Sequence, residues 1–281
     1  MTPVVAIVAA GNMGAGLGRR LTEHGVKVVT LLTGRSPASH ARAAEAGMIG
    51  VSPETLVEAD LLLSIVPPAN ALAFAEQTAF ALKSARRKPV FVDCNAVSPA
   101  TVRHIHAVIA ATGAEFVDGG IIGFPPVPAN ATGPRLYVSG EHATKVQVLS
   151  GFGTDVRVLD GPVGAASALK MAYAGISKGH IAIMAAMLLA AERAGSTKAL
   201  REELAVSEPH LMATMARRVP GMFPKAYRWG AEMEEIAEFA RDDPAAHEIW
   251  MNIARFYDRL AQDVAGAKQE TATLARFFEG G

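Results

Sequence analysis

The stretch VVAIVAAGNMGAGLG, Val4 to Gly18, decides the fold. Its first five residues are apolar and mostly β-branched, which is typical of a buried strand. A glycine-rich turn follows, and apolar residues then recur at helical spacing from Met13 through Leu17 to Leu21. The stretch therefore predicts a strand, a tight turn and a helix in direct succession.

The glycines of this turn indicate a dinucleotide site. Gly11 would let the backbone approach a pyrophosphate, and Gly14 would let the helix pack closely against the strand. The backbone amides of Asn12 and Met13 would face the phosphates at the positive end of the helix. Ala9 stands where the dinucleotide-binding pattern has its first glycine. A glycine-rich turn without a ligand is the alternative, and the strand–turn–helix context argues against it.

Short β-branched runs alternate with helical patterns over residues 1–161, which predicts a parallel sheet covered on both faces. Ser36-Pro37 and Ser98-Pro99 each place a capping serine before a proline, which marks a helix start. The predicted fold class is an α/β Rossmann domain with a doubly wound, mostly parallel sheet. The expected strands are Val4–Val8, Val26–Leu32, Asp60–Val66, Pro89–Asp93, Glu115–Asp118, Arg135–Ser139 and Asp155–Leu159.

From residue 162 the apolar residues follow helical spacing alone. We therefore expect two domains, at residues 1–161 and 162–281, the second of them all-helical. It should begin with a long helix that joins the two halves and starts as GAASALKMAYAGISKG, Gly164 to Gly179. Later helices should be separated by breaks at Gly195-Ser196, Pro209, Val219–Pro224 and Pro244.

The loop LLTGRSPAS, which follows the second predicted strand, favours NADP(H) over NAD(H). A site that prefers NAD(H) usually has a carboxylate there for the ribose 2′-hydroxyl, and this loop has no acidic residue. Thr33, Arg35 and Ser36 instead offer a cation and two hydroxyl groups that suit a 2′-phosphate. The alternative is that Arg35 is a solvated loop residue.

The composition excludes several classes of partner. The 281 residues include 27 basic and 27 acidic side chains, so the net charge is zero and no basic stripe favours nucleic acid or an anionic membrane. The charge-free run Ile181–Ala191 is shorter than the roughly 20 residues that span a bilayer. The single cysteine, Cys94, cannot form an internal disulfide, and the first residues lack a basic leader. We expect a cytoplasmic protein that binds a small-molecule substrate.

A set of motifs runs through the chain in order. They are GNMG in the first turn, GRS after the second strand, SIVPP (Ser64–Pro68), VDCNAVSP (Val92–Pro99), VDGGIIG (Val117–Gly123) and GAASALKMAYAGISKG. With this set the sequence resembles the β-hydroxyacid dehydrogenase family, which includes 6-phosphogluconate and 3-hydroxyisobutyrate dehydrogenases. It is most similar to a phosphogluconate dehydrogenase-like bacterial branch with an uncharacterised C-terminal helical domain. RWGAEMEEIAEF, Arg228 to Phe239, looks like the signature of that domain.

The resemblance implies a Rossmann domain, a helical domain that forms a homodimer, and an active site between the two. It implies that Lys170, on the long interdomain helix, donates or accepts the proton. Asn95 matches a position near the nicotinamide where the family often has serine or threonine. Val66 and Pro67 match the loop that lines the cofactor.

Two departures from the family's pattern bear on the substrate. Ile122 stands where the family's substrate loop commonly has a serine, and Ala174 stands where an asparagine commonly follows the lysine by four residues. Both changes remove polar groups, and the apolar segment FPPVP, Phe124 to Pro128, points the same way. They argue against a simple 3-hydroxy acid and more strongly against a sugar phosphate. The expected substrate is a carboxylate-bearing compound like a β-hydroxy acid, or a moderately apolar one. The expected substrate-binding residues are Ile122, Gly123, Ser167, Tyr173 and Ala174.

Lys170 lies within an apolar helix, and a buried ammonium is costly unless it is paired or gives up its proton. Apolar surroundings favour the neutral amine, so such a lysine can act as an acid or base near neutral pH. Ser167 and Tyr173 lie on roughly the same helix face and could position the amine or the substrate. The alternatives are that Lys170 reaches out to water or pairs with a carboxylate.

Other reactive side chains receive structural interpretations. Lys178 lies eight residues after Lys170, about 80° round the helix, and is predicted to be an interface or solvated lysine. Glu232 is predicted to lie on a charged helix face, and Cys94 in the core. No His, Cys and carboxylate cluster has metal-ligand spacing, so the sequence predicts no metal site.

The sequence therefore predicts an NADP(H)-dependent oxidoreductase that interconverts a carbonyl and an alcohol, with Lys170 as general acid/base. One alternative is an imine reductase with an apolar pocket, although the related imine reductases usually lack the lysine. The other alternative is a catalytically silent nucleotide-binding sensor.

Overall fold

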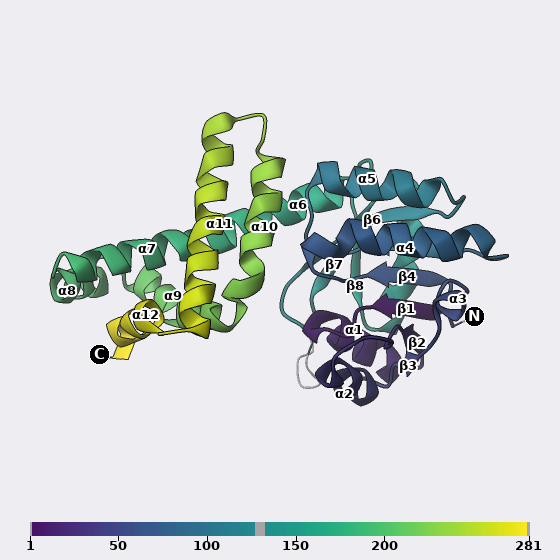
Figure 1. Cartoon of the computed structure of the whole chain (residues 1–281), viewed down its shortest axis with the longest axis horizontal. Helices are drawn as coiled ribbons and strands as arrows, with labels where there is room; N and C mark the ends of the chain where they lie inside the picture. The colour runs from purple at the N-terminus through teal and green to yellow at the C-terminus, as the bar shows by residue number, and fades with distance from the viewer. Residues whose placement is uncertain (1, 127–132, 280–281) are drawn as a thin grey trace. The chain divides into compact units, whose positions relative to one another are not determined.

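The computed structural model describes residues 2–126 and 133–279 (Figure 1). Of the segment FPPVP, residues 127 and 128 lie outside this description. The chain divides into two compact units, Met1–Met171 and Ala172–Gly281. The division lies inside α6 (Ala165–Ala174), so Lys170 belongs to the first unit, whereas the predicted boundary after residue 161 precedes this helix.

The first unit is built on one eight-stranded sheet in the order β3-β2-β1-β4-β5-β6-β7-β8. Neighbouring strands run parallel except for the pair β6 and β7. This order confirms the predicted doubly wound fold, and such a sheet holds its ligand at the carboxyl ends of the strands where the order reverses, here β1 and β4. The strands are β1 Val4–Val8, β2 Lys27–Thr30, β3 Ile49–Gly50, β4 Leu61–Ser64, β5 Val90–Asp93, β6 Phe116–Ile122, β7 Arg135–Ser139 and β8 Asp155–Val158.

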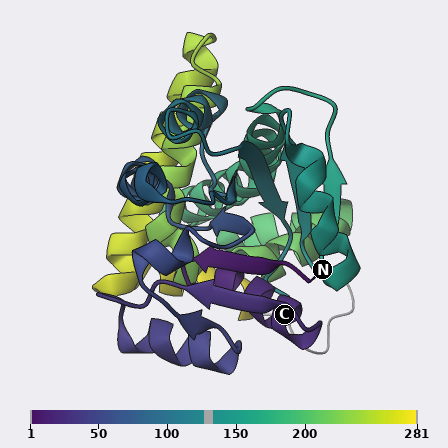
Figure 2. The same cartoon turned by 90° about the vertical axis from the view of Figure 1, so that its right-hand side faces the viewer.

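Helices cover both faces of this sheet (Figure 2). Val5 and Ile7 of β1 pack in one core cluster with residues of α1, α2 and η2, whereas Ala6 and Val8 pack in another with residues of α3, α4 and α5. A strand buried on both faces explains why VVAIV shows no polar alternation. The helices before α6 are α1 Asn12–Glu23, α2 Pro37–Glu45, α3 Pro53–Leu56, η1 Pro68–Asn70, α4 Ala71–Ser84, α5 Pro99–Ala110 and η2 Ala143–Phe152.

Several helices begin with a polar cap followed by proline. Ser36 and Ser98 accept backbone N–H groups at the starts of α2 and α5, which confirms both predicted starts. Ser52 caps α3, and Asp243 caps α11 (Pro244–Ala265), by the same combination. A serine or aspartate before proline is therefore a consistent start signal in this chain.

The second unit contains only helices among its described residues, as the spacing predicts. After α6, the elements are the π-helical turn η3 Gly175–Gly179, then α7 His180–Arg193, α8 Thr197–Ser207, α9 Pro209–Arg218, η4 Pro220–Lys225, α10 Ala226–Phe239, α11 Pro244–Ala265 and α12 Gln269–Glu279. The predicted breaks Gly195-Ser196 and Val219–Pro224 fall between α-helices, the second of them largely within the short 3-10 helix η4, and Pro209 and Pro244 are the first residues of α9 and α11.

The π-helical turn η3 is fixed by side chains from α11. A methyl group at Gly179 would lie 2.6 Å from atoms of the Trp250 ring, so the glycine makes room for that ring. The hydroxyl of Tyr257 donates to the carbonyl of Lys178 at 2.6 Å. Burial raises the pKa of the Tyr257 hydroxyl, and the nearby charge of Glu232 raises it further. Tyr257 is therefore a neutral donor that satisfies a carbonyl of the irregular turn.

The predictions that Lys178 is solvated and that Glu232 lies on a charged helix face are wrong. The alternative of an interface lysine is not tested. The two side chains form an ion pair in which they are only 18% and 9% exposed. The Lys178 ammonium also lies 5.1 Å from the centroid of the Trp229 ring. The partners are 54 residues apart, and the π-helical turn changes the direction of Lys178 from that of an uninterrupted α-helix. The spacing of residues along the helix predicts neither the distant partner nor the π-helical turn.

The run α6, η3 and α7, from Ala165 to Arg193, has 29 residues, and the mean hydropathy of its most apolar window is 1.5. Within the described residues it is long and apolar enough, by length and composition alone, to cross a membrane. The stretch Ile181–Ala191 underestimates its length because the helix continues through η3. A core helix has the same properties, and 56% of this window is buried inside the chain.

Removing one partner of the Lys178–Glu232 pair should destabilise the helical unit. Lys178→Met leaves the buried Glu232 carboxylate without this cation, so we expect to lose about 3–5 kcal/mol of unfolding free energy. Adding Glu232→Leu removes both charges and should restore most of that loss. Urea unfolding followed by tryptophan fluorescence measures both, with the exposed Lys198→Met as the control. A single variant as stable as the parent would contradict this assignment.

Candidate active site

The glycine turn opens at the carboxyl end of β1, and α1 begins there with Gly11 as its N-cap. A Cβ at Gly14 would lie 2.0 Å from the carbonyl oxygen of Ala9, so glycine is required for this close packing. A Cβ at Gly11, by contrast, would have no heavy atom within 4 Å. The turn is therefore closed towards the sheet and open on the side of Gly11.

These features fit the pyrophosphate of a dinucleotide. In the part of the chain that the structure describes, the amides of Asn12 and Met13 have no protein acceptor. The Met13 side chain packs against the core, so only its backbone is offered to a ligand. The amide of Ala9 donates to the carbonyl of Ile65 at 3.1 Å, which ties the turn to the end of β4. Alanine in place of the first glycine thus leaves the phosphate cradle intact.

The residues predicted to select a 2′-phosphate, Thr33, Arg35 and Ser36, follow β2 and are all exposed. The Ser36 hydroxyl caps α2 and lies 3.1 Å from the hydroxyl of Ser39. Among the described residues, Arg35 has no ion-pair partner. Its guanidinium is therefore available to an anion at this edge of the sheet.

Arg42, on α2, also contributes to this region and was missed by the sequence analysis. Its Nε donates to the carbonyl of Ala10 at 3.0 Å, and its Nη2 donates to the Ser39 hydroxyl at 3.2 Å. The side chain thus ties α2 to the glycine turn, which connects the two predicted parts of the cofactor site. The contact joins residues 32 apart, so local sequence carries no signal for it.

Asn95, Val66 and Pro67 follow the carboxyl ends of β5 and β4. The Asn95 Oδ1 accepts from the amide of Val66 at 2.7 Å, and its Nδ2 donates to Ser64 Oγ and to Asp93 Oδ2, both at 2.9 Å. Asn95 is buried, so its side chain braces the two strand ends. Its contact with a nicotinamide stays a prediction.

Lys170 lies at the same edge of the sheet. Its Nζ donates to the carbonyl oxygen of Ile121, near the carboxyl end of β6, at 2.9 Å. The side chain is half-buried, and none of the described carboxylates pairs with it. The lysine is therefore directed by a neutral acceptor, and the predicted alternative of a structural ion pair finds no support.

Asp118, fully buried in β6, holds the first turn of α6. Its Oδ2 accepts from the amides of Gly164, Ala166 and Ser167 at 2.8, 2.9 and 3.1 Å. The hydroxyls of Ser139 and Ser167 also donate to this carboxylate, at 2.9 and 2.6 Å. The helix that carries Lys170 is thus anchored to the sheet through one carboxylate.

Two glycines after Asp118 allow strand and helix to approach closely. A Cβ at Gly120 would lie 2.9 Å from the carbonyl oxygen of Ala166 and 3.2 Å from the Cβ of Lys170. A Cβ at Gly119 would lie 2.9 Å from a carbonyl oxygen of β5. An acid followed by two glycines inside a buried strand is a signal from which the sequence could have indicated this contact.

The predicted substrate residues have different surroundings. Ser167 is fully buried and donates its hydroxyl to the carboxylate that caps α6, and its predicted contact with substrate stays untested. Ile122 is buried, and Gly123 has a φ of 130°, which favours glycine. Tyr173 and Ala174 belong to the second unit, Tyr173 half-exposed and Ala174 buried. Contacts of these last four with a substrate stay predictions.

Cys94 lies in the core, as predicted. Burial raises the pKa of its thiol, and the carboxylates of Asp93 and Asp118 raise it further. A thiol kept neutral in this way is a poor nucleophile. Within residues 2–126 and 133–279, no group of three His, Cys, Asp or Glu side chains could hold a metal ion.

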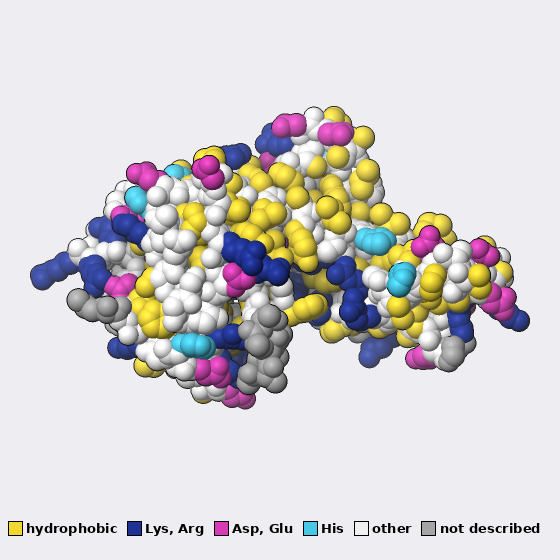
Figure 3. Space-filling model, turned by 180° about the vertical axis from the view of Figure 1, so that it is seen from behind, with side chains coloured by type: hydrophobic (Ala, Val, Ile, Leu, Met, Phe, Trp, Pro, Cys, Tyr) yellow, Lys and Arg dark blue, Asp and Glu magenta, His cyan; other side chains and the backbone are white. Residues whose placement is uncertain are grey.

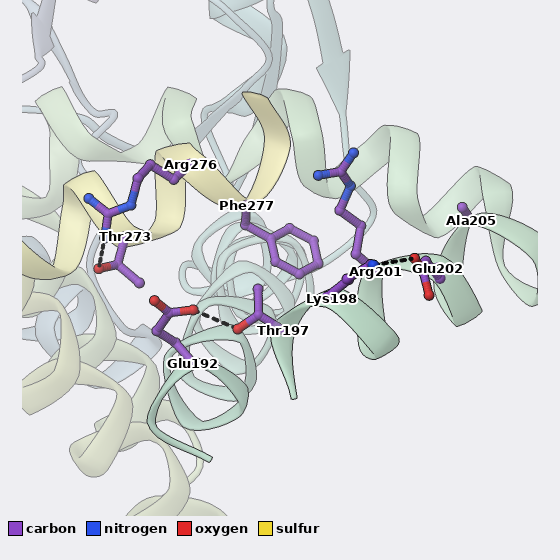
Figure 4. A pocket seen from close by; sticks show the side chains of 9 residues that line it. All are labelled: Glu192, Thr197, Lys198, Arg201, Glu202, Ala205, Thr273, Arg276 and Phe277. Atoms are coloured by element: carbon purple, nitrogen blue, oxygen red, sulfur yellow. Dashed lines mark hydrogen bonds and ion pairs between the residues drawn. The ribbon is translucent and has the colours of Figure 1, made fainter. Parts of the chain in front are cut away.

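A cavity of about 520 Å³ lies among α7, α8 and α12 of the second unit (Figure 4). Several of its polar side chains bond to one another: Thr197 donates to Glu192 at 2.6 Å, and Lys198 forms an ion pair with Glu202 at 3.9 Å. No residue of the predicted site lines it, so we assign it no part in the chemistry. Its lining residues are Glu192, Thr197, Lys198, Arg201, Glu202, Ala205, Thr273, Arg276 and Phe277.

Comparison with known families identifies both parts of the chain. The NAD binding domain of 6-phosphogluconate dehydrogenase matches residues 4–152. A domain of unknown function, DUF1932, matches residues 191–260. An uncharacterised 28.5 kDa protein of Methanothermus fervidus is 31% identical over 217 residues, which cover 76% of this chain and 82% of that protein.

Solved structures share the fold over almost the whole chain. A conserved protein of unknown function, described as similar to 3-hydroxyacid dehydrogenases, is 28% identical with a TM-score of 0.68, covering 96% of this chain and 98% of that one. The 3-hydroxyisobutyrate dehydrogenase of Mycobacterium tuberculosis is 21% identical with a TM-score of 0.69, covering 98% and 99%. An imine reductase of Myxococcus stipitatus is 18% identical with a TM-score of 0.55, covering 99% and 100%. The last two likenesses concern the fold alone.

The first family match covers more than half of the chain, and the open glycine turn fits the cofactor that this family uses. The chain therefore belongs to the β-hydroxyacid dehydrogenase family, as its motifs predict, and is an NAD(P)-dependent oxidoreductase of the hydroxyacid dehydrogenase type.

Proposed function

We propose that the protein uses NADP(H) to interconvert a carbonyl and an alcohol, with Lys170 as the general acid/base. The observation that carries this proposal is the position of the Lys170 ammonium. It lies 2.9 Å from the carbonyl of Ile121, at the same edge of the sheet as the glycine turn and within the same compact unit. The proposed proton donor and the glycine turn thus lie at one edge of the same sheet.

The reaction needs a group that exchanges a proton with the substrate oxygen. The nicotinamide, when bound, supplies or accepts the hydride. The ammonium of Lys170 has three N–H groups, and the contact with Ile121 uses one of them. The remaining donors are free to approach a substrate oxygen, to which the lysine gives its proton during carbonyl reduction and from which it takes one during alcohol oxidation.

The preference for NADP(H) rests on the loop after β2. Arg35 and Ser36 are exposed there, and Arg42 holds α2 against the glycine turn. A cation with hydroxyl groups suits a 2′-phosphate, and the loop has no carboxylate to bind a free 2′-hydroxyl. The substrate we propose bears a carboxylate, as the family membership suggests, or is moderately apolar, because Ile122 and Ala174 replace polar groups of the family's pattern.

Replacing the proton donor tests the catalytic role. Lys170→Met should lower kcat by at least about a hundredfold, the usual scale for a proton-transfer group, while the dissociation constant of NADPH changes little. Steady-state kinetics and NADPH fluorescence titration measure the two quantities. Lys83→Met, which removes an exposed lysine of α4, is the matched control. Near-normal turnover of the Lys170 variant would overturn the assignment.

Replacing Arg35 tests the cofactor preference separately. Arg35→Ala should weaken NADPH binding by at least about tenfold and NADH binding far less, because only NADPH carries the 2′-phosphate. The exposed Arg86→Ala on the same unit controls for loss of positive charge. Equal affinity of the parent protein for NADPH and NADH would refute the preference, whatever the variant does.

An imine reductase is the second candidate, and its support is the fold likeness to the enzyme of Myxococcus stipitatus. The retained lysine favours carbonyl or alcohol chemistry over this candidate. Reduction of a cyclic imine by the parent protein that continues after Lys170→Met would reverse that order.

We also propose a homodimer formed through the helical unit. Ile183 and Met187 lie one turn apart on α7 and are 56% and 60% exposed, and Ile176, in η3, is 77% exposed. Figure 3 shows hydrophobic side chains on the surface of this unit among the charged ones. Exposed apolar side chains of this size on one unit are typical of a surface that a partner covers.

Light scattering tests the dimer. The parent protein should have twice the mass of one chain, and Ile183→Glu with Met187→Glu should convert it to a folded monomer. Val206→Glu, at an apolar side chain of α8 that is 84% exposed, is the control and should leave the mass unchanged. A monomeric parent protein would reject the proposal.

A further inference from the structure

We propose that Asp118 is the positioning residue for Lys170: its buried carboxylate fixes the start of α6 and thereby the place from which the lysine acts. The importance of this positioning for catalysis rests on the proposed role of Lys170. That Asp118 fixes the position of the Lys170 amine rests only on contacts inside the first unit.

The Asp118 carboxylate receives its hydrogen bonds from the first turn of α6 and from β7. The donors are three backbone amides, those of Gly164, Ala166 and Ser167, and two hydroxyls, those of Ser139 and Ser167. Backbone amides can only donate, so the carboxylate acts there as an acceptor. The first amides of a helix otherwise lack partners, and the positive end of the helix stabilises a negative charge. The Asp118 side chain is thus the cap that this buried helix end requires.

The cap fixes the position of Lys170 because α6 packs directly against β6. Lys170 follows Ser167 by three residues, which is less than one helical turn. Its Cβ lies where a side chain on Gly120 would meet it at 3.2 Å, and the carbonyl of Ala166 lies 2.9 Å from the same point. Its Nζ donates to Ile121, the next residue of the same strand. Three residues of β6 therefore contact this part of α6. Asp118 binds the start of the helix, Gly120 packs against the Cβ of Lys170, and Ile121 accepts a hydrogen bond from its ammonium.

The neighbouring acid provides a matched comparison. Asp93 is the register partner of Asp118 on β5 and is equally buried. It accepts hydrogen bonds from the amide and the side chain of Asn95, whereas Asp118 accepts them from the start of α6. Asp93→Asn and Asp118→Asn therefore remove the same acid from adjacent strands, and the second removes the acceptor that anchors the lysine helix.

The test measures the Lys170 amine directly and needs no substrate. Trace labelling of the full-length protein with acetic anhydride, read by mass spectrometry, gives the reactivity of each lysine against pH. Lys83 in the same sample is the internal reference. In Asp118→Asn we expect the relative reactivity of Lys170 to change by at least about threefold and its pH profile to shift, because the amine leaves its fixed place. Asp93→Asn should leave both unchanged.

Hydrogen exchange of the Ala166 and Ser167 amides provides the second readout. Exchange should accelerate in Asp118→Asn and not in Asp93→Asn. Faster exchange with an unchanged Lys170 profile would show that Asp118 stabilises the helix without positioning the lysine. Unchanged exchange would show that Asp118 does not cap the helix. Either result overturns the proposal. An equal change of Lys170 in both aspartate variants would overturn it as well.

A milder variant keeps the proposal testable if Asp118→Asn does not fold. Ser139→Ala removes one donor to Asp118 and one acceptor of the Ala166 amide, and retains the carboxylate. It should shift the Lys170 profile in the same direction by a smaller amount, and no shift would contradict the proposal. If Lys170→Met retains turnover, the proposed catalytic role fails, yet the labelling result still decides whether Asp118 positions the amine.

Discussion

The anchoring of α6 by the carboxylate of Asp118 is the contact on which the candidate site depends. Asp118 belongs to a row of buried polar residues, with Ser64, Asp93 and Ser139, that are register partners across four neighbouring strands. Buried polar groups are costly unless they are bonded, and three of these carry an identified task. Asp93 and Ser64 hold the loop ends around Asn95, and Asp118 holds the helix of Lys170. These buried polar residues thus position Asn95 and the helix of Lys170 at the edge of the sheet.

Sequence reasoning predicted the sheet well because its signals are local. The glycine turn, the β-branched runs and the serine–proline starts of α2 and α5 each depend on residues within a few positions of one another. It was less successful where partners are distant. The Lys178–Glu232 pair and the contact of Arg42 with Ala10 join residues 54 and 32 apart. The direction of Lys178 was also predicted from a uniform α-helix, and the π-helical turn changes it.

The sequence predicted which residues form the site, but not the structural role of each of them. The sequence selected Lys170, Gly11 and Gly14, and the structure gives each of them surroundings that suit the expected task. It assigned Ser167 to the substrate and did not foresee that its hydroxyl donates to Asp118 at the start of α6. Asp118 attracted no interpretation of its own, although the two glycines after it marked a close approach of backbone. A buried acid in a strand next to glycines is therefore worth reading as a helix anchor.

In the proposed function, the cofactor contacts backbone and loop residues after β1 and β2, which follow from the fold. The proposed substrate contacts depend on a few side chains, among which Ile122 and Ala174 offer no polar group to select a substrate. The most direct test of the central claim is a panel of hydroxy acids and carbonyl compounds, including moderately apolar ones, assayed in both directions by NADPH absorbance. We predict turnover of at least one compound, faster with NADP(H) than with NAD(H). Tight NADPH binding without turnover anywhere in the panel would contradict the account and leave a nucleotide-binding sensor in its place.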